Sequence, residues 1–81
     1  MYSRKEENIG GRHLLIQLGN MIKKIRADRK MSQMALAELC GFQKATMSKI
    51  ESGLMNITMA TLKCITDALG VSVGELLSVL D

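Results

Sequence analysis

Apolar residues recur at steps of three and four over most of the chain, which is the period of an amphipathic helix. Over residues 12–29 this pattern predicts a long first helix with one apolar side. The residues on that side are Leu14, Leu18, Ile22 and Ile25. Residues 1–11 are mostly polar and end in Gly10-Gly11, so we expect a flexible N-terminal arm ahead of a domain at residues 12–81.

Polar caps and glycines divide the middle of the chain into two short helices. Ser32 can cap the first of them, and Gly41 can end it with a left-handed backbone. The second is predicted from about Gln43 to Gly53, so three or four residues around Gly41 separate the two. This layout, over about residues 32–53, is typical of a helix-turn-helix, whose second helix enters the major groove of DNA. The residues predicted to point inward from the first of these helices are Leu36, Leu39 and Cys40.

The last third of the chain predicts two more helices after a loop at residues 54–57. Thr58 and Ser72 are suitable caps, and Gly70 ends the first of the two. Their apolar positions are Leu62, Ile65 and Leu69, then Leu76, Leu77 and Leu80. Five short helices with tight, glycine-marked joints predict an all-α fold, a compact five-helix bundle.

The helix predicted after Gly41 has two unlike sides when about 100° is allowed for each residue. Met47 and Ile50 point to one side. The opposite side carries small or basic residues, namely Lys44, Ala45, Ser48 and Lys49. Short side chains with a few long donors suit a helix that must lie close to base edges. A plain amphipathic surface helix is the other interpretation of this pattern.

The distribution of charge indicates a class of partner. The chain has 81 residues, which is the size of one domain, and 47% of them are hydrophobic and 23% charged, as in a folded protein. Residues 1–53 hold ten Lys or Arg and five Asp or Glu (net +5), whereas residues 54–81 hold one and three (net −2). The basic part contains the predicted helix-turn-helix and favours a polyanion as partner. A solvated basic surface explains the asymmetry equally well.

The residues needed for catalysis or metal binding do not occur in a suitable pattern. The chain has one histidine, His13, and two cysteines, Cys40 and Cys64, without CxxC or His-rich spacing. We therefore expect no enzyme activity, no metal, no cofactor and no small-molecule ligand, and we expect the cysteines to be buried free thiols. No stretch approaches the roughly 20 apolar residues of a membrane span, and no signal peptide is visible. The expected location is the cytoplasm.

Residues 18–77 resemble the Cro/phage-repressor (Xre-type) helix-turn-helix family. The resemblance is carried by LGNMIKKIRADRKMSQMALAELCGFQKATMSKIESG, by Asn56 and by TLKCITDALGVSVGELL. Its most specific part is the set formed by Ser-Gln, Leu-Ala, Gly and Thr-x-Ser-x-Ile-Glu-x-Gly. The resemblance implies a lambda-repressor-like domain that binds double-stranded DNA and regulates transcription.

The resemblance also implies roles for individual positions. The base-reading positions of the family match Gln43, Lys44, Ala45, Ser48 and Lys49. The positions that contact the DNA backbone match Gln33, Thr46 and Asn56. Arg26 and Glu51 match an ion pair that ties the first helix to the end of the third, and we expect its role to be structural.

Four sites depart from the family pattern. Gln43 stands where a Ser or Thr cap is usual, which weakens the cap or frees Gln43 to reach a base. Lys30 replaces a common Gly, and Ile57 a common Pro. Leu54-Met55 replaces a basic pair, which removes phosphate contacts or creates an apolar site for a protein partner.

The function favoured by the sequence is specific binding of an inverted-repeat operator by a homodimer, as in phage repressors or restriction-modification controllers. The predicted dimer contacts come from the last helix, because so small a core cannot cover all of its apolar residues. These contacts are Leu76, Val79 and Leu80. Leu15 and Ile16 either extend the first helix or make a subunit contact. The alternative function is a protein-interaction module with the same fold, such as an antitoxin, supported by Leu54-Met55.

Overall fold

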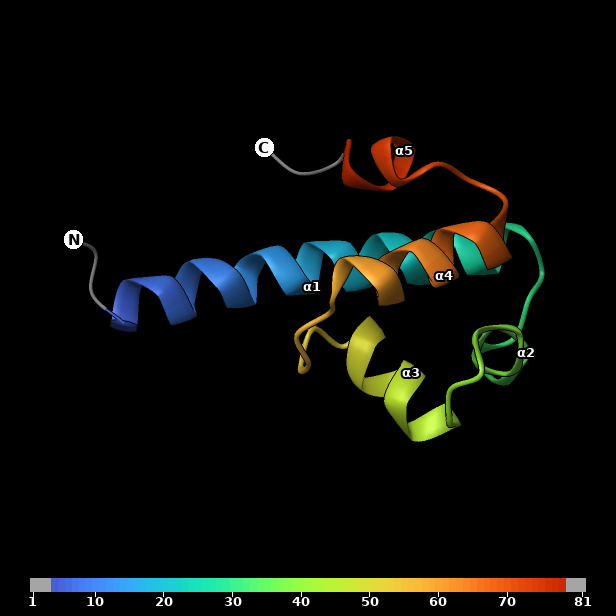
Figure 1. Cartoon of the computed structure of the whole chain (residues 1–81), viewed down its shortest axis with the longest axis horizontal. Helices are drawn as coiled ribbons and strands as arrows, with labels where there is room; N and C mark the ends of the chain where they lie inside the picture. Colours follow the sequence, from blue (N-terminus) through green and yellow to red (C-terminus); the bar gives the residue numbers. More distant parts are fainter. Residues whose placement is uncertain (1–3, 79–81) are drawn as a thin grey trace.

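The structure is a computed structural model that describes residues 4–78, with side chains from residue 11 to residue 78. Within these residues it forms five α-helices and no strand, which confirms the predicted all-α fold (Figure 1). The helices are α1 (Arg4–Asp28), α2 (Gln33–Cys40), α3 (Lys44–Glu51), α4 (Met59–Leu69) and α5 (Val73–Leu77). No helix in this part of the chain combines the length and the apolar character needed to cross a membrane.

Helix α1 begins at Arg4, ahead of the predicted start at Arg12. This differs from the flexible arm expected at residues 1–11, because residues 4–11 continue the helix and residues 1–3 lie outside the described residues. Gly10 and Gly11 each lower helix propensity by about 1 kcal/mol relative to alanine, which weakens a helix but does not end one that continues on both sides. The first turns of α1 extend beyond the other helices (Figure 1).

The core is formed by one side of each helix. Helix α1 packs against α2, α3 and α5, and α4 packs against α2 and α5. The buried apolar residues are Leu18, Ile22, Ile25, Leu36, Ala37, Met47, Ile50, Leu62, Ile65, Leu69 and Leu76. Most of them are the positions that the helical period predicts.

Two predicted core residues are exposed. Leu14 is 45% exposed, because the buried side of α1 begins one turn later, at Leu18. Leu39 is 64% exposed, and the small Ala37, at 1%, faces the core in its place. Ala37 lets α2 pack closely, so the buried side of α2 is rotated away from Leu39.

The predicted burial of the thiols is wrong for Cys64. Cys64 is exposed, since α4 buries Leu62 and Ile65 and turns Cys64 outward. Cys40, the last residue of α2, is half-buried.

The helix boundaries follow the predicted caps. Ser32, Thr58 and Ser72 each accept a hydrogen bond from a backbone N–H of the first turn that follows. Gly41 and Gly70 end α2 and α4 with φ of 73° and 74°, in the left-handed region that glycine adopts without strain.

The prediction that Leu76 contacts a second subunit is wrong. It is 0% exposed, because α5 packs on both α1 and α4 and Leu76 is part of the core between them. Val79 and Leu80, the other two predicted contacts, lie outside the described residues.

Candidate nucleic-acid interface

One side of α3 faces outward and carries the residues predicted to read bases. Met47 and Ile50 are 0% and 1% exposed, so they anchor the opposite side of α3 in the core. The exposed residues, which we call the outer face of α3, are Gln43, Lys44, Ala45, Ser48 and Lys49. The outer face offers two ammonium groups, a carboxamide, a hydroxyl and a methyl group. A surface of small side chains with a few long donors can approach the edges of base pairs in a major groove.

The turn between α2 and α3 fixes how α3 is presented. Gly41 donates its N–H to the carbonyl of Glu38 (3.1 Å), and Phe42 donates to the carbonyl of Ala37 (2.8 Å). These bonds satisfy carbonyls at the end of α2, and the half-buried Phe42 packs against the core. Helices α2 and α3 are therefore held as a rigid pair, on the opposite side of α1 from α5 (Figure 1).

The N-terminus of α3 lacks the side-chain cap that α2, α4 and α5 have. Gln43 is its N-cap residue, and the Gln43 side chain makes no capping hydrogen bond to any described residue. The carboxamide is exposed at the end of α3 where backbone N–H groups point outward. The Gln43 carboxamide is therefore not used as a cap and can contact a ligand.

The C-terminal end of α3 is tied to α1 by the ion pair that the family resemblance implied. Arg26 donates from Nε to Glu51 Oε2 (2.8 Å) and from Nη2 to Glu51 Oε1 (2.9 Å). Its Nη1 donates to the carbonyl oxygen of Met31 (2.9 Å), ahead of α2. The hydrogen bonds to Glu51 raise the pKa of Arg26 above its usual value, against the opposing effect of burial, so the guanidinium group stays charged at neutral pH.

Gln33 joins the same network. Its Nε2 donates to Glu51 Oε1 (3.1 Å), which links the first residue of α2 to the last residue of α3. The sequence indicated a DNA backbone contact for Gln33 but not this bond. A carboxamide has two N–H donors, so the Gln33 amide keeps one for a phosphate at the N-terminus of α2.

The other two predicted backbone contacts lie apart from this network. Thr46 is half-buried within α3, and Asn56 is exposed in the segment between α3 and α4. The structure thus brings Gln33 to Glu51 and groups five residues on the outer face of α3, whereas Asn56 comes from a separate segment.

Gly19 contributes to the site and was missed from the sequence. A Cβ atom added at Gly19 would lie 2.5 Å from the carbonyl oxygen of Glu51 and 2.7 Å from that of Ile50. The α1 backbone therefore lies directly against the last turn of α3. The signal that could have revealed Gly19 is a glycine inside a helical pattern, which often marks close packing.

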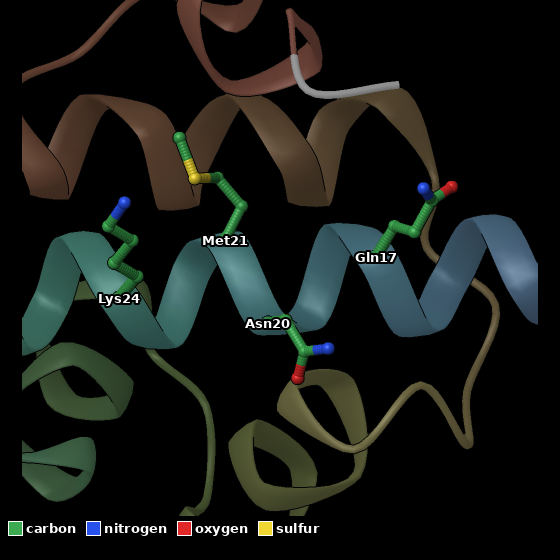
Figure 2. Close-up of a pocket in the computed structure, with 4 residues that line it drawn as sticks. All are labelled: Gln17, Asn20, Met21 and Lys24. Atoms are coloured by element: carbon green, nitrogen blue, oxygen red, sulfur yellow. The ribbon is translucent and has the colours of Figure 1, made fainter. Parts of the chain in front are cut away.

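A shallow hollow of about 270 Å³ lies on another part of α1, where its lining includes Gln17, Asn20, Met21 and Lys24. Figure 2 shows Gln17 and Met21 pointing toward α4 and Asn20 pointing toward α3. These four side chains provide carboxamides, a thioether and an ammonium group. They do not form the acid–base pair that catalysis by general acid and base requires.

The thiols have no evident chemical role. Burial raises the pKa of Cys40, and the nearby Cys64 adds to this effect, so Cys40 stays protonated at neutral pH. Among the described residues no three His, Cys, Asp or Glu side chains come together in a group that could hold a metal ion.

Comparison with known proteins places the chain in a family. Residues 21–81 match the model of the Cro/C1-type HTH DNA-binding domain. The chain belongs to this family. The match includes α2, α3 and the outer face, so the helix-turn-helix described above is that of a DNA-binding domain.

Two relatives and one solved structure show what the chain is similar to. The immunity repressor protein of Bacillus phage phi105 is 34% identical over 59 residues, which cover 73% of this chain and 41% of the repressor. The control protein C.MunI of a Mycoplasma species is 33% identical over 64 residues, 78% of this chain and 86% of that protein. The crystal structure of the clp gene regulator ClgR of Corynebacterium glutamicum superposes with a TM-score of 0.79 at 29% identity, covering 80% of this chain and 69% of ClgR. The chain thus spans about two fifths of the length of the phage repressor that it matches.

Proposed function

We propose that this protein is a transcription regulator that binds a specific sequence of double-stranded DNA. The observation that carries the proposal is the outer face of α3, where small and basic side chains stand opposite the buried Met47 and Ile50. Lys44 and Lys49 can donate to guanine O6 and N7, Gln43 can pair with an adenine edge, and Ala45 can contact a thymine methyl group. These contacts distinguish base pairs and therefore carry specificity.

The backbone contacts of the proposal position α3 in the groove. Gln33 lies at the N-terminus of α2, where free N–H groups and the helix dipole favour a phosphate. Thr46 and Asn56 are the further phosphate contacts that the family resemblance implies. Such contacts contribute affinity for any sequence, whereas the base contacts contribute discrimination.

The proposed active form is a homodimer on an inverted-repeat operator. One module of this size contacts too few base pairs to define a site in a genome, and two modules related by a two-fold axis read half-sites about 34–36 Å apart. Helices α5 and α3 lie on opposite sides of α1, so a second copy docked beyond α5 leaves α3 accessible (Figure 1). Val79 and Leu80 are the proposed apolar contacts, and the buried Leu76 is not one of them.

The similarity to a phage immunity repressor and to a control protein supports a role as a phage-type repressor or a restriction-modification controller. Both roles require DNA as partner, and we propose the cytoplasm as the location.

One observation favours a second function, a protein-interaction module such as an antitoxin. Leu54, in the segment between α3 and α4, is 66% exposed, and Met59, the first residue of α4, is 67% exposed. Exposed apolar side chains that lie together can mark a site that binds another protein.

Retention of duplex DNA at near-physiological salt separates the two functions. The experiment measures binding of the purified protein to a pool of random 30-base-pair duplexes at about 150 mM salt, where weak electrostatic binding is largely suppressed. A DNA regulator retains a subset of the pool at nanomolar concentration, and this subset survives competition with excess bulk DNA. A protein-interaction module retains none of the pool under the same conditions, and that result contradicts the proposal.

A further inference from the structure

Two glycines form the joint between α1 and the end of α3. Gly19 lies within α1, and Gly53 follows α3 with φ of 73°. A Cβ atom at Gly53 would lie 2.7 Å from Ile16 Cα, and one at Gly19 would lie 2.5 Å from the Glu51 carbonyl oxygen. The contacts on α1, at Ile16 and Gly19, are about one turn apart. Gly19 of α1 lies against the main chain of the last turn of α3, and Gly53 lies against the main chain of α1.

The contact at Gly19 cannot be relieved by a side-chain rotation. The three atoms nearest to an added Cβ are the Glu51 oxygen, the Ile50 oxygen at 2.7 Å and the Glu51 carbonyl carbon at 2.8 Å, all of them backbone. A methyl group there must therefore move α3 away from α1 or bend one of the two. Gly11, in the same helix, is different, since among the described residues nothing lies within 4 Å of its added Cβ.

Arg26 binds Glu51, the same residue of α3, from the same side of α1. It lies seven residues after Gly19, which is about two helical turns. Its guanidinium group holds the Glu51 carboxylate with two bonds of 2.8 and 2.9 Å, and this carboxylate is 3% exposed. Helix α1 therefore contacts Glu51 through both the main chain and the side chain.

The opposite end of α3 is joined to α2 by the turn at Gly41 and Phe42, and the Gln43 side chain adds no cap with the described residues. Met47 and Ile50 anchor the inner side of α3 but do not by themselves determine how far its end stands from α1. Gly19 and Arg26 therefore set how closely the last turn of α3 lies against α1.

We propose that Gly19 is a positioning residue for DNA specificity, although it contacts no base, and that it acts beside the ion pair of Arg26 and Glu51. The proposal rests on the proposed function of the outer face of α3. Hydrogen bonds to base edges hold over a range of only a few tenths of an ångström around 2.9 Å, so a small shift of α3 weakens them. Non-specific binding depends mainly on the phosphate charge and tolerates a range of geometries, so the same shift changes it less.

The test compares Gly19→Ala with the matched control Gly11→Ala. For each variant the affinity is measured for an operator obtained by selection and for an unrelated duplex, at 10 °C and after circular dichroism shows a folded protein. Gly19→Ala is expected to weaken operator binding about ten-fold, the effect of one good base contact, and to change binding of the unrelated duplex less than about two-fold. Gly11→Ala is expected to leave both affinities within about two-fold of wild type while raising the melting temperature through its better helix propensity.

A folded Gly19→Ala variant with unchanged discrimination overturns the proposal, and so does an equal loss on both duplexes. If Gly19→Ala does not fold even in the Gly11→Ala background, the same two affinities are measured for Arg26→Lys. This variant keeps the positive charge but loses the bidentate hydrogen bonds to Glu51. A selective loss of operator binding by Arg26→Lys supports the proposal, and unchanged discrimination overturns it. If the wild-type protein does not discriminate between the two duplexes, the result contradicts the proposed function itself and not the role of Gly19 alone.

Discussion

Arg26 and Glu51 lie 25 residues apart in the chain and form a two-pronged ion pair between α1 and the last residue of α3. Glu51 is 5% exposed and also accepts a hydrogen bond from Gln33 at the start of α2. One buried carboxylate therefore connects three helices. The helix that bears the outer face is tied at this point both to the long helix and to the proposed phosphate contact.

Removal of Arg26 is expected to destabilise the protein. Arg26→Met leaves the buried Glu51 carboxylate without its cation, which costs about 3–5 kcal/mol of unfolding free energy in comparable pairs. Arg26→Met/Glu51→Met removes both charges and is expected to regain a large part of this stability, as paired apolar replacements often do. Urea unfolding followed by circular dichroism measures both values.

The exposed pair of Lys63 and Asp67 is the control for this experiment. Its ammonium and carboxylate groups are 2.7 Å apart and more than half exposed, so Lys63→Met is expected to cost only about 0.3–0.5 kcal/mol. An Arg26→Met variant that unfolds like wild type, with DNA binding lost, would mean that Arg26 contacts DNA directly.

Substitution on the outer face is expected to change sequence preference. Lys44→Ala and Lys49→Ala each remove a donor from α3 and should cost about 1–3 kcal/mol of binding free energy on the operator and relax the preference at one base pair. Lys63→Ala removes the same charge from α4, where Asp67 already compensates it, and should leave the preference intact. Competition titrations with operators changed at single positions provide the measurement, and wild-type preference in both outer-face variants would show that another surface reads the bases.

Gln33→Ala is expected to weaken binding to all sequences alike. A hydrogen bond to a charged group contributes about 1.5–3 kcal/mol, and a phosphate contact carries no information about the base. The half-buried Gln33 is not the main partner of Glu51, so the unfolding transition should shift little. Titrations against an operator and an unrelated duplex test this expectation, which fails if Gln33→Ala loses affinity for a single operator variant only.

The helical period predicted the fold because most core positions obey it in each helix. It failed at Leu14 and at Leu39, and at Leu39 the reason is that a short helix can rotate by one residue when a small side chain such as Ala37 packs closely in the core. The family resemblance indicated the pairing of Arg26 with Glu51, and local period indicated the outer face of α3. The contacts of Gly19 with Glu51 and of Gln33 with Glu51 were not predicted, because they depend on how close two helices distant in sequence approach each other.

The dimer can be tested apart from the core. Val79→Glu/Leu80→Glu is expected to give a folded monomer with much weaker operator binding, because charge repulsion opposes an apolar interface. Leu76→Ala is expected to lower the unfolding free energy by about 2–5 kcal/mol, as for other buried leucines, without separating the subunits of the folded fraction. Sedimentation at micromolar concentration measures the mass of each form, and a wild-type monomer both free and on a half-site would rule out the dimer.

Selection of binding sites from random duplex DNA tests the central claim most directly. The wild-type protein is incubated with the pool at about 150 mM salt, and the retained duplexes are sequenced after several rounds. Because two copies of the outer face of α3 are proposed to read the DNA, we expect an inverted repeat whose half-sites are centred about 10–10.5 base pairs apart. A retained pool without an enriched sequence would contradict specific recognition by α3, and a single unrepeated motif would contradict the two-fold dimer.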